Sequence, residues 1–279
     1  MSPSFTVLLC HGSYHTPEPY QPFLASLEAR GIPAICPQLP TSSPSKLNTG
    51  SPSHPSYDLP PPPGGYPQQA DDVAVILTLL NQLIVEEGRN ILFMGHSSGG
   101  LTATAAAIPE LQREWREKEG KRGGVIGVFY ECAFLVPVGE SVHSFFQPKD
   151  GSPPVIPPYC KFHQNGMEGL MSTVEGAKYF FNGLDDEKAK YYESTLTAST
   201  ILTTVLENDA YPALPCIYLV TENDLALPAA YQEGMVALQN QREEVDIGVL
   251  KCPSGHSPHL TWMDGLVEEV VKFGNGLLG

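Results

Sequence analysis

Six short apolar runs, separated by segments with helical periodicity, constrain the fold of this 279-residue chain more than any other feature. The runs do not alternate with polar residues, as expected of strands that are buried on both faces. They lie at residues 5–10, 33–37, 90–94, 125–134, 216–220 and 246–252. Strands that alternate with helices favour a mostly parallel sheet, so we predict an α/β fold with about six strands flanked by helices.

Two segments interrupt this alternation. Residues 137–206 are aromatic, helical in pattern and broken by prolines, which predicts a helical lid inserted after the fourth strand, between core segments 1–136 and 207–279. Residues 40–66 show no periodicity and carry 8 of the 27 prolines, so we predict a long surface loop after the second strand. Long loops in compact domains are often functional, and we expect this one to cover part of a pocket mouth.

The charge balance excludes several classes of partner. The chain has 16 basic and 31 acidic residues, a formal net charge of −15. An acidic surface repels phosphate backbones and anionic lipids, which argues against nucleic-acid and membrane-surface roles. A small-molecule substrate is therefore the expected partner, and a homodimer stays open.

The six cysteines form no C-x-x-C pair and no metal-ligand spacing. Five of them lie in or beside apolar strand-like runs, where free cysteine behaves as a small buried hydrophobe. We therefore expect reduced thiols and no metal or organic cofactor. No Lys or Arg precedes Arg30 and no apolar stretch reaches transmembrane length, so a cytoplasmic location is expected.

The third apolar run leads directly into Gly95-His96-Ser97-Ser98-Gly99, and a helical pattern follows. A G-x-S-x-G sequence between a strand and a helix is typical of a tight turn that exposes a nucleophilic serine. The flanking residues are small because larger side chains would clash in such a turn. We predict that Ser97 is the nucleophile and that the following helix N-terminus favours negative charge there.

A serine hydroxyl needs a base, and in this arrangement the partners follow in the order Ser, acid, His. His256 comes directly after the sixth run and is the predicted base, with His259 as a rival. Asp224 follows the fifth run and is the predicted acid, with Glu222 nearby and Glu131 at the end of the fourth run as alternatives.

An acyl-transfer intermediate also needs donors for its oxyanion. We predict the backbone N–H of Ser98 and, from the loop after the first run, the N–H of Ser13, with Tyr14 as the alternative. Other residues beside these loops and in the lid are expected to line the substrate pocket: His11, Gly12, His96, Phe145, Phe146, Phe180, Phe181 and Trp262.

Several motifs together resemble the α/β-hydrolase superfamily over nearly the whole chain. They are residues 11–17, 95–100, 133–137, 139–141, 180–182, 224–228 and 256–258. The closest resemblance is to the compact branch of plant methylesterases, hydroxynitrile lyases and many fungal proteins of unassigned substrate. It implies a Ser97–Asp224–His256 triad and a lid that selects the substrate. Hydroxynitrile lyases carry lysine where this chain has Ser257, which argues against cyanohydrin cleavage.

The predicted function is a serine hydrolase that cleaves an ester, lactone or thioester of a small apolar, polyketide-like specialised metabolite. Two alternatives use the same scaffold. An acyl-serine intercepted by a hydroxyl gives a lactone-forming cyclase or acyltransferase, and carbon-bond cleavage without hydrolysis gives a lyase. A third is a ligand-binding, receptor-like module. Fold and motif do not separate these functions, because water exclusion and substrate pose decide between them.

Overall fold

A six-stranded parallel sheet forms the centre of the computed structural model, which describes residues 5–51 and 54–278. Residues 1–4, 52–53 and 279, at the ends of the predicted core and within the proline-rich segment, lie outside the described residues. The strands are β1 (Thr6–Cys10), β2 (Ala34–Ile35), β5 (Asn90–His96), β6 (Gly124–Glu131), β10 (Cys216–Thr221) and β11 (Ile247–Cys252). Their order is β11-β10-β6-β5-β1-β2, and every neighbouring pair is parallel. The predicted α/β architecture is confirmed.

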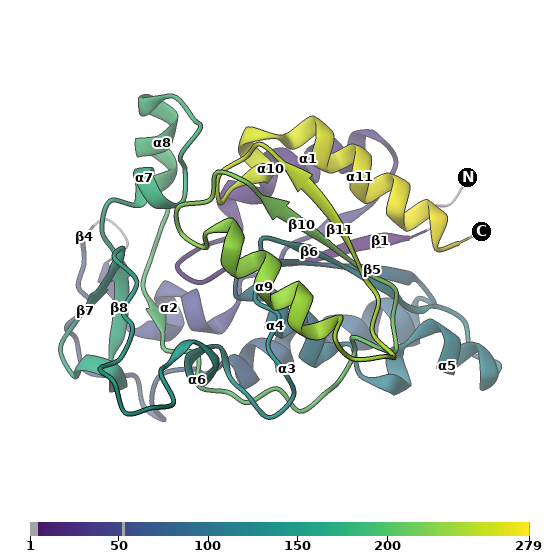
Figure 1. Cartoon of the computed structure of the whole chain (residues 1–279), viewed down its shortest axis with the longest axis horizontal. Coiled ribbons are helices and arrows are strands. Elements are labelled where there is room, and N and C mark those ends of the chain that lie inside the picture. Colours follow the sequence, from purple (N-terminus) through teal and green to yellow (C-terminus); the bar gives the residue numbers. More distant parts are fainter. Residues whose placement is uncertain (1–4, 52–53, 279) are drawn as a thin grey trace.

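Helices cover both faces of this sheet (Figure 1). Helices α1 (Gln21–Ala29), α10 (Pro258–Thr261) and α11 (Met263–Gly276) lie on one face, and α3 (Gln69–Leu80), α4 (Gly99–Ala106) and α9 (Ala229–Gln239) lie on the other. Side chains of a strand point alternately to the two faces. Val7 and Leu9 accordingly pack in the cluster with α1 and α11, whereas Leu8 packs in the cluster with α3 and α9.

Shorter helical pieces connect these elements. They are η1 (Glu18–Tyr20), the π-helical turn η3 (Asn81–Glu86), η4 (Pro109–Leu111) and α5 (Arg113–Lys118). The π turn directly continues α3, so residues 69–86 form one helical segment with a change of winding near its end.

The segment inserted between β6 and β10 differs from the predicted wholly helical lid. It contains α6 (Val142–Phe146), η5 (Gly166–Glu168), α7 (Gly176–Tyr179) and α8 (Asp186–Glu193). It also forms a three-stranded antiparallel sheet from β7 (Cys160–Phe162), β8 (Leu170–Thr173) and β9 (Ser199–Thr200). These strands have two to four residues, too few to show a period of two in the sequence, and their pairing depends on contacts along the insertion.

The proline-rich segment 40–66 is also more ordered than predicted. It contains η2 (Pro40–Ser42), α2 (Pro44–Leu47) and the strand pair β3 (Gly50–Ser51) and β4 (His54–Pro55). Proline begins both η2 and α2, a position where its fixed φ suits a helix and its missing N–H costs nothing. The segment then contacts the insertion, where the Gln164 N–H donates to Asp58 Oδ1 at 2.6 Å.

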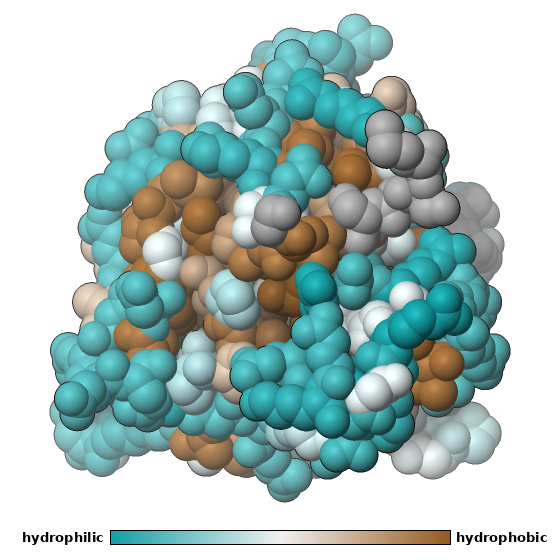
Figure 2. All heavy atoms as spheres, turned by 90° about the vertical axis from the view of Figure 1, so that its right-hand side faces the viewer, coloured by the Kyte–Doolittle hydropathy of each residue, from teal (hydrophilic) through white to brown (hydrophobic). Residues whose placement is uncertain are grey.

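The face on the right of Figure 1 carries both chain ends and the amino ends of the strands. Figure 2 shows this face, which is hydrophilic over most of its area with apolar residues grouped near the middle. Among the described residues, no helix is long and apolar enough to cross a membrane.

Candidate active site

The predicted nucleophile, acid and base lie in loops at the carboxyl edge of the sheet. Because the strands are parallel, the loops that follow them emerge on the same side. The strand register pairs Cys10 with Gly95, and His96 with Glu131, so the loops after β1, β5 and β6 begin at one level. Thr221 pairs with Cys252, which brings together the loops after β10 and β11.

Ser97 occupies the turn between β5 and α4 with a strained backbone. Its φ is 52°, in the left-handed region that residues other than glycine rarely adopt. The turn is held by hydrogen bonds from Ser97 N–H to the Glu131 carbonyl (3.2 Å) and from Phe134 N–H to the Ser97 carbonyl (2.9 Å). A side chain at Gly99 would overlap the Cys10 carbonyl. In the described part of the chain, Ser97 Oγ has no hydrogen bond, which leaves the hydroxyl free to rotate.

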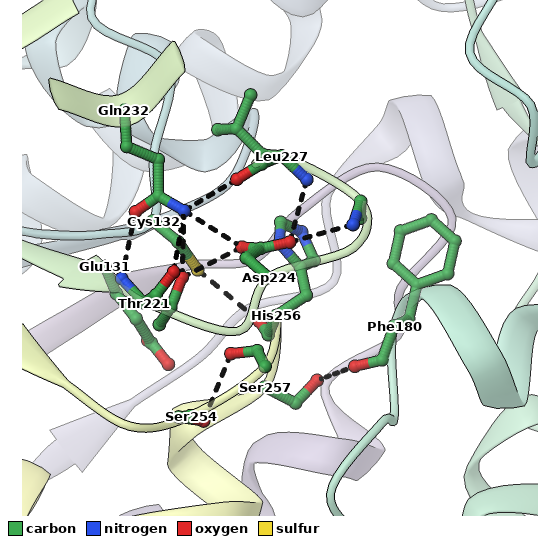
Figure 3. Close-up of polar contacts among 12 residues, drawn as sticks. Glu131, Cys132, Phe180, Thr221, Asp224, Leu227, Gln232, Ser254, His256 and Ser257 are labelled. Carbon is green, nitrogen blue, oxygen red and sulfur yellow. Dashed lines mark hydrogen bonds and ion pairs between the residues drawn. The ribbon is translucent and has the colours of Figure 1, made fainter. Parts of the chain in front are cut away.

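Asp224 and His256 form a buried hydrogen-bonded pair (Figure 3). His256 Nδ1 lies 2.8 Å from Asp224 Oδ2. The backbone N–H groups of Ala226 and Leu227 donate to Asp224 Oδ1 at 2.8 and 2.7 Å. Because the carboxylate accepts, the proton of the imidazole lies on Nδ1, and Nε2 keeps the lone pair that a base needs.

Two residues that the sequence did not indicate donate hydrogen bonds to Asp224 Oδ2, the oxygen that also contacts His256. Thr221 Oγ1 donates to Asp224 Oδ2 at 2.9 Å, and Gln232 Nε2 donates to the same oxygen at 3.2 Å. The Thr221 N–H donates to Gln232 Oε1 at 3.0 Å, which orients the amide. Gln232 is fully buried on α9, and nothing in the local sequence distinguishes it from an exposed helical glutamine.

The rival acid and the rival base pair with each other. His259 Nδ1 lies 2.8 Å from Glu131 Oε1, and both side chains are fully buried. Glu222, the other rival acid, is exposed. Within the described residues, neither Glu131 nor Glu222 hydrogen-bonds the His256 ring, so Asp224 is the carboxylate that orients it.

The predicted oxyanion donors lie close to one another. Ser13 Oγ donates to Ser98 Oγ at 2.9 Å, which joins the loop after β1 to the turn after β5. A Cβ at Gly12 would lie 2.9 Å from Ser97 Cβ, so the backbone approaches the serine closely. The Tyr14 N–H donates to Ser42 Oγ at 3.1 Å and is therefore occupied. The N–H groups of Ser13 and Ser98 have no hydrogen-bond acceptor among the described residues, which leaves them available for a ligand.

His96 joins three of these loops rather than lining a pocket as predicted. Its Nε2 donates to the His256 carbonyl at 2.8 Å, and its Nδ1 accepts from the Tyr20 hydroxyl at 2.7 Å. Tyr20 in turn accepts the Gly12 N–H at 3.2 Å. Burial lowers the pKa of His96 well below its ordinary value, which keeps the ring neutral and this hydrogen-bond direction intact. No sequence pattern indicated Tyr20, because its role depends on two distant segments.

Of the predicted aromatic pocket residues, Phe180 lies beside the candidate base. Its ring centroid is 5.5 Å from that of His256 and 6.0 Å from that of Tyr14. The Phe180 carbonyl accepts a hydrogen bond from Ser257 Oγ at 2.7 Å (Figure 3). Phe181 is fully buried, with its ring 5.7 Å from Tyr192 within the insertion.

The remaining predicted pocket residues pack elsewhere. Phe146 contacts Phe145 and, at 5.3 Å, Phe134, and both rings of α6 pack against the core cluster on the α3 and α9 face. Trp262 packs against the opposite cluster beneath α11. His11 is buried, and both of its ring nitrogens bond the backbone. The size and aromatic character of these side chains do not predict whether they pack in the core or line a pocket.

Among the residues that the structure describes, two groups have the right types to hold a metal ion. His96, Cys132 and His256 form one, and His96, Glu131 and His259 form the other, with possible ligand atoms within 4.8 Å of each other. His96 belongs to both, but each of its ring nitrogens already has a hydrogen-bond partner. A metal would have to displace the contacts that join Tyr20, His96 and His256.

A parallel sheet with a strained serine turn after β5, and with a carboxylate–histidine pair after β10 and β11, defines the α/β hydrolases as a class. A model of the Alpha/beta hydrolase family matches residues 7–269, and the chain belongs to that family.

The chain is 24% identical over 266 residues to Alpha/beta hydrolase nvfD of Aspergillus novofumigatus, a match that covers 95% of this chain and 94% of the relative. Among solved structures, a pyrethroid hydrolase from Sphingobium faniae has a TM-score of 0.71 and 18% identity, with 97% of both chains covered. Polyneuridine aldehyde esterase has a TM-score of 0.68 and 14% identity, with 97% of this chain and 99% of the esterase covered. The family predicted from the motifs is thus confirmed, the chain is a hydrolase of this family, and it shares its fold with a pyrethroid hydrolase and an esterase.

Proposed function

We propose that this protein is a serine hydrolase that cleaves an ester, lactone or thioester of a small apolar metabolite through an acyl-enzyme. The observation that carries the proposal is the buried Asp224–His256 pair, which comes from the same sheet edge as the strained Ser97 turn. A nucleophile, a base and a group that orients the base are the minimum set for this chemistry.

In the first half-reaction, Ser97 Oγ attacks the substrate carbonyl carbon and its proton passes to His256 Nε2. Asp224 stabilises the imidazolium that forms, and the Ser13 and Ser98 N–H groups donate to the oxyanion. Collapse of the intermediate breaks the acyl–oxygen or acyl–sulfur bond, and His256 protonates the leaving group. In the second half-reaction, water gives its proton to His256 and attacks the acyl carbon, which releases the acid and restores Ser97.

Aromatic side chains beside the site support an apolar acyl group. Phe180 lies against His256, and Tyr14 and Tyr159 lie against Phe180 at 6.0 and 5.0 Å between ring centroids. Apolar pockets with few polar groups favour ligands of the same character. The name of one solved neighbour, polyneuridine aldehyde esterase, supports an ester of a small metabolite as the kind of substrate.

A fluorophosphonate probe tests the nucleophile, with Ser97→Ala as the matched control. We expect covalent labelling of the wild-type protein at Ser97, none of Ser97→Ala, and turnover of at least one member of a panel of aryl esters and lactones. Absence of labelling at Ser97 would contradict the proposal. Labelling without turnover of any panel member would favour the cyclase, acyltransferase or receptor functions instead.

A further inference from the structure

The turn formed by residues 39–42, where the proline-rich segment begins, hydrogen-bonds the loop that carries the candidate oxyanion donor Ser13. The Leu39 N–H donates to His11 Nε2 at 2.9 Å, on one side of Ser13. On the other side, the Tyr14 N–H donates to Ser42 Oγ at 3.1 Å. Tyr14 has a φ of 67°, a conformation that a bulky residue keeps only when its surroundings impose it. The turn 39–42 thus contacts both residues that flank the Gly12–Ser13 peptide.

His11 transmits this contact to the peptide that contains the donor. A backbone N–H can only donate, so His11 Nε2 is the acceptor and the ring proton lies on Nδ1. Nδ1 then donates to the Gly12 carbonyl at 2.9 Å, and the His15 N–H donates to the same oxygen at 3.3 Å. The Gly12 carbonyl and the Ser13 N–H belong to one planar peptide and point in opposite directions. Holding the carbonyl therefore aims the Ser13 N–H.

The turn is itself anchored by a buried carboxylate on α3. The Thr41 N–H donates to Asp72 Oδ1 at 2.9 Å, and Thr41 Oγ1 donates to Asp72 Oδ2 at 2.7 Å. Asp72 is 2% exposed and Ser42 is fully buried. From the same turn of α3, Gln69 Nε2 donates to the Ser98 carbonyl at 3.1 Å. The first turn of α3 therefore reaches the residues of both candidate donors, Ser98 directly and Ser13 through the turn 39–42.

We infer that Asp72, Thr41 and Ser42 are positioning residues that set the direction of the Ser13 N–H in the oxyanion hole. The inference rests on the proposed serine hydrolase function and gives the proline-rich segment a role different from the predicted cover of a pocket mouth. None of the three residues is assigned a contact with the substrate. Their effect should therefore fall on the transition state rather than on substrate binding.

Steady-state kinetics of Thr41→Val and Ser42→Ala test this inference with the best ester from the panel. A missing oxyanion donor costs a factor of about 10² to 10³ in kcat. Because a misaligned donor retains part of its effect, we expect kcat to fall about tenfold in each variant while KM stays within twofold. The rate of Ser97 phosphonylation should fall in parallel, since the phosphonyl oxygen carries charge in the same hole.

Matched controls separate alignment from general damage. Thr78→Val makes the same change on the exposed side of α3, where the Thr78 hydroxyl donates to the Ala74 carbonyl of its own helix at 2.9 Å. Ser45→Ala makes the second change elsewhere in the proline-rich segment. Both controls should keep the wild-type kcat, and Thr41→Ser, which retains the hydroxyl, should recover most of the activity lost in Thr41→Val. Thermal unfolding confirms that each variant is folded.

An unchanged kcat in folded Thr41→Val and Ser42→Ala would overturn the inference, and so would a rise in KM at constant kcat. A wild-type protein that neither labels nor turns over any ester would instead contradict the proposed function itself. The two failures are therefore distinguishable in one set of measurements.

Discussion

Two carboxylate–imidazole pairs lie near each other at the carboxyl edge of the sheet, and they differ in what surrounds them. Asp224–His256 and Glu131–His259 have the same 2.8 Å distance from Nδ1 to the carboxylate oxygen. His96 lies between them, with its ring centroid 4.8 Å from that of His256 and 5.1 Å from that of His259. Distance and residue type therefore do not decide which pair performs chemistry.

The two pairs differ in the surroundings of the imidazole Nε2 and of the carboxylate oxygens. Among the described residues, His259 Nε2 and Glu131 Oε2 are enclosed without a hydrogen-bond partner, and the Tyr20 ring stacks on His259 at 4.3 Å. His256 Nε2, by contrast, is not one of the enclosed atoms without a partner in the described chain. Both oxygens of Asp224 accept several donors, so the carboxylate is fixed in place. The first pair orients the candidate base, and the second is enclosed in the core.

Removal of the two imidazoles in turn should give the largest contrast. We expect His256→Gln to lower kcat by about 10⁶, because loss of the base leaves only binding and oxyanion stabilisation. His259→Gln should keep kcat within tenfold, since the His259 ring is fully buried, paired with Glu131 and stacked on Tyr20. Ester turnover by both purified variants is the measurement. A comparable loss in His259→Gln would show that the second pair takes part in the reaction.

Substitution of the two carboxylates, Asp224 and Glu131, should also give unequal losses of kcat, with a smaller difference than for the two histidines. Asp224→Asn is expected to lower kcat by about 10⁴, because an amide stabilises the wrong imidazole tautomer. Glu131→Gln should leave kcat within a few-fold but cost about 1–3 kcal/mol of unfolding free energy, since the new amide N–H₂ has no partner in its enclosed position. Kinetics and urea unfolding of both variants check this. Equal kinetic losses would remove the distinction between the pairs.

Acid should lower the free energy of unfolding, because His11, His15 and His96 are buried as neutral rings. Burial lowers the pKa of His11 to about 4 and lowers those of His15 and His96 well below their ordinary values. The unfolded chain takes up these protons near pH 6.5, whereas the folded protein does not. The free energy of unfolding should therefore fall as the pH drops from about 6.5 to about 4, by about 3 kcal/mol for His11 alone.

Asp72 opposes this trend. Burial raises its pKa to about 7, so its contribution is present at low pH and is lost as the pH rises through that value. Three histidines outweigh one carboxyl group, and the net slope should stay positive between pH 4.5 and 6.5. Urea unfolding of the wild type, His15→Gln and the control His143→Gln measures it. The slope should decrease only in His15→Gln, and a flat wild-type profile would be inconsistent with neutral buried histidines.

The sequence is sufficient to predict the pairing of Asp224 with His256, but it does not predict the residues that hydrogen-bond and position this site. A residue just after an apolar strand of a parallel sheet must lie at the carboxyl edge, which places Ser97, Asp224 and His256 there without knowledge of contacts. Gln232, Tyr20 and Ser42 act on segments 8 to 76 residues away through side chains that no local pattern marks. The same limit applies to the short strands of the insertion.

The sequence by itself determined the α/β architecture, the position of the serine turn, and the strand ends that carry the candidate acid and base. Apolar periodicity and strand order are local properties, and they are sufficient for these conclusions. Tertiary structure decided that Glu131 pairs with His259, that Ser42 of the proline-rich segment hydrogen-bonds the loop after β1, and which aromatic rings lie beside His256. These outcomes depend on which buried polar groups find partners across the fold, a condition that only packing satisfies.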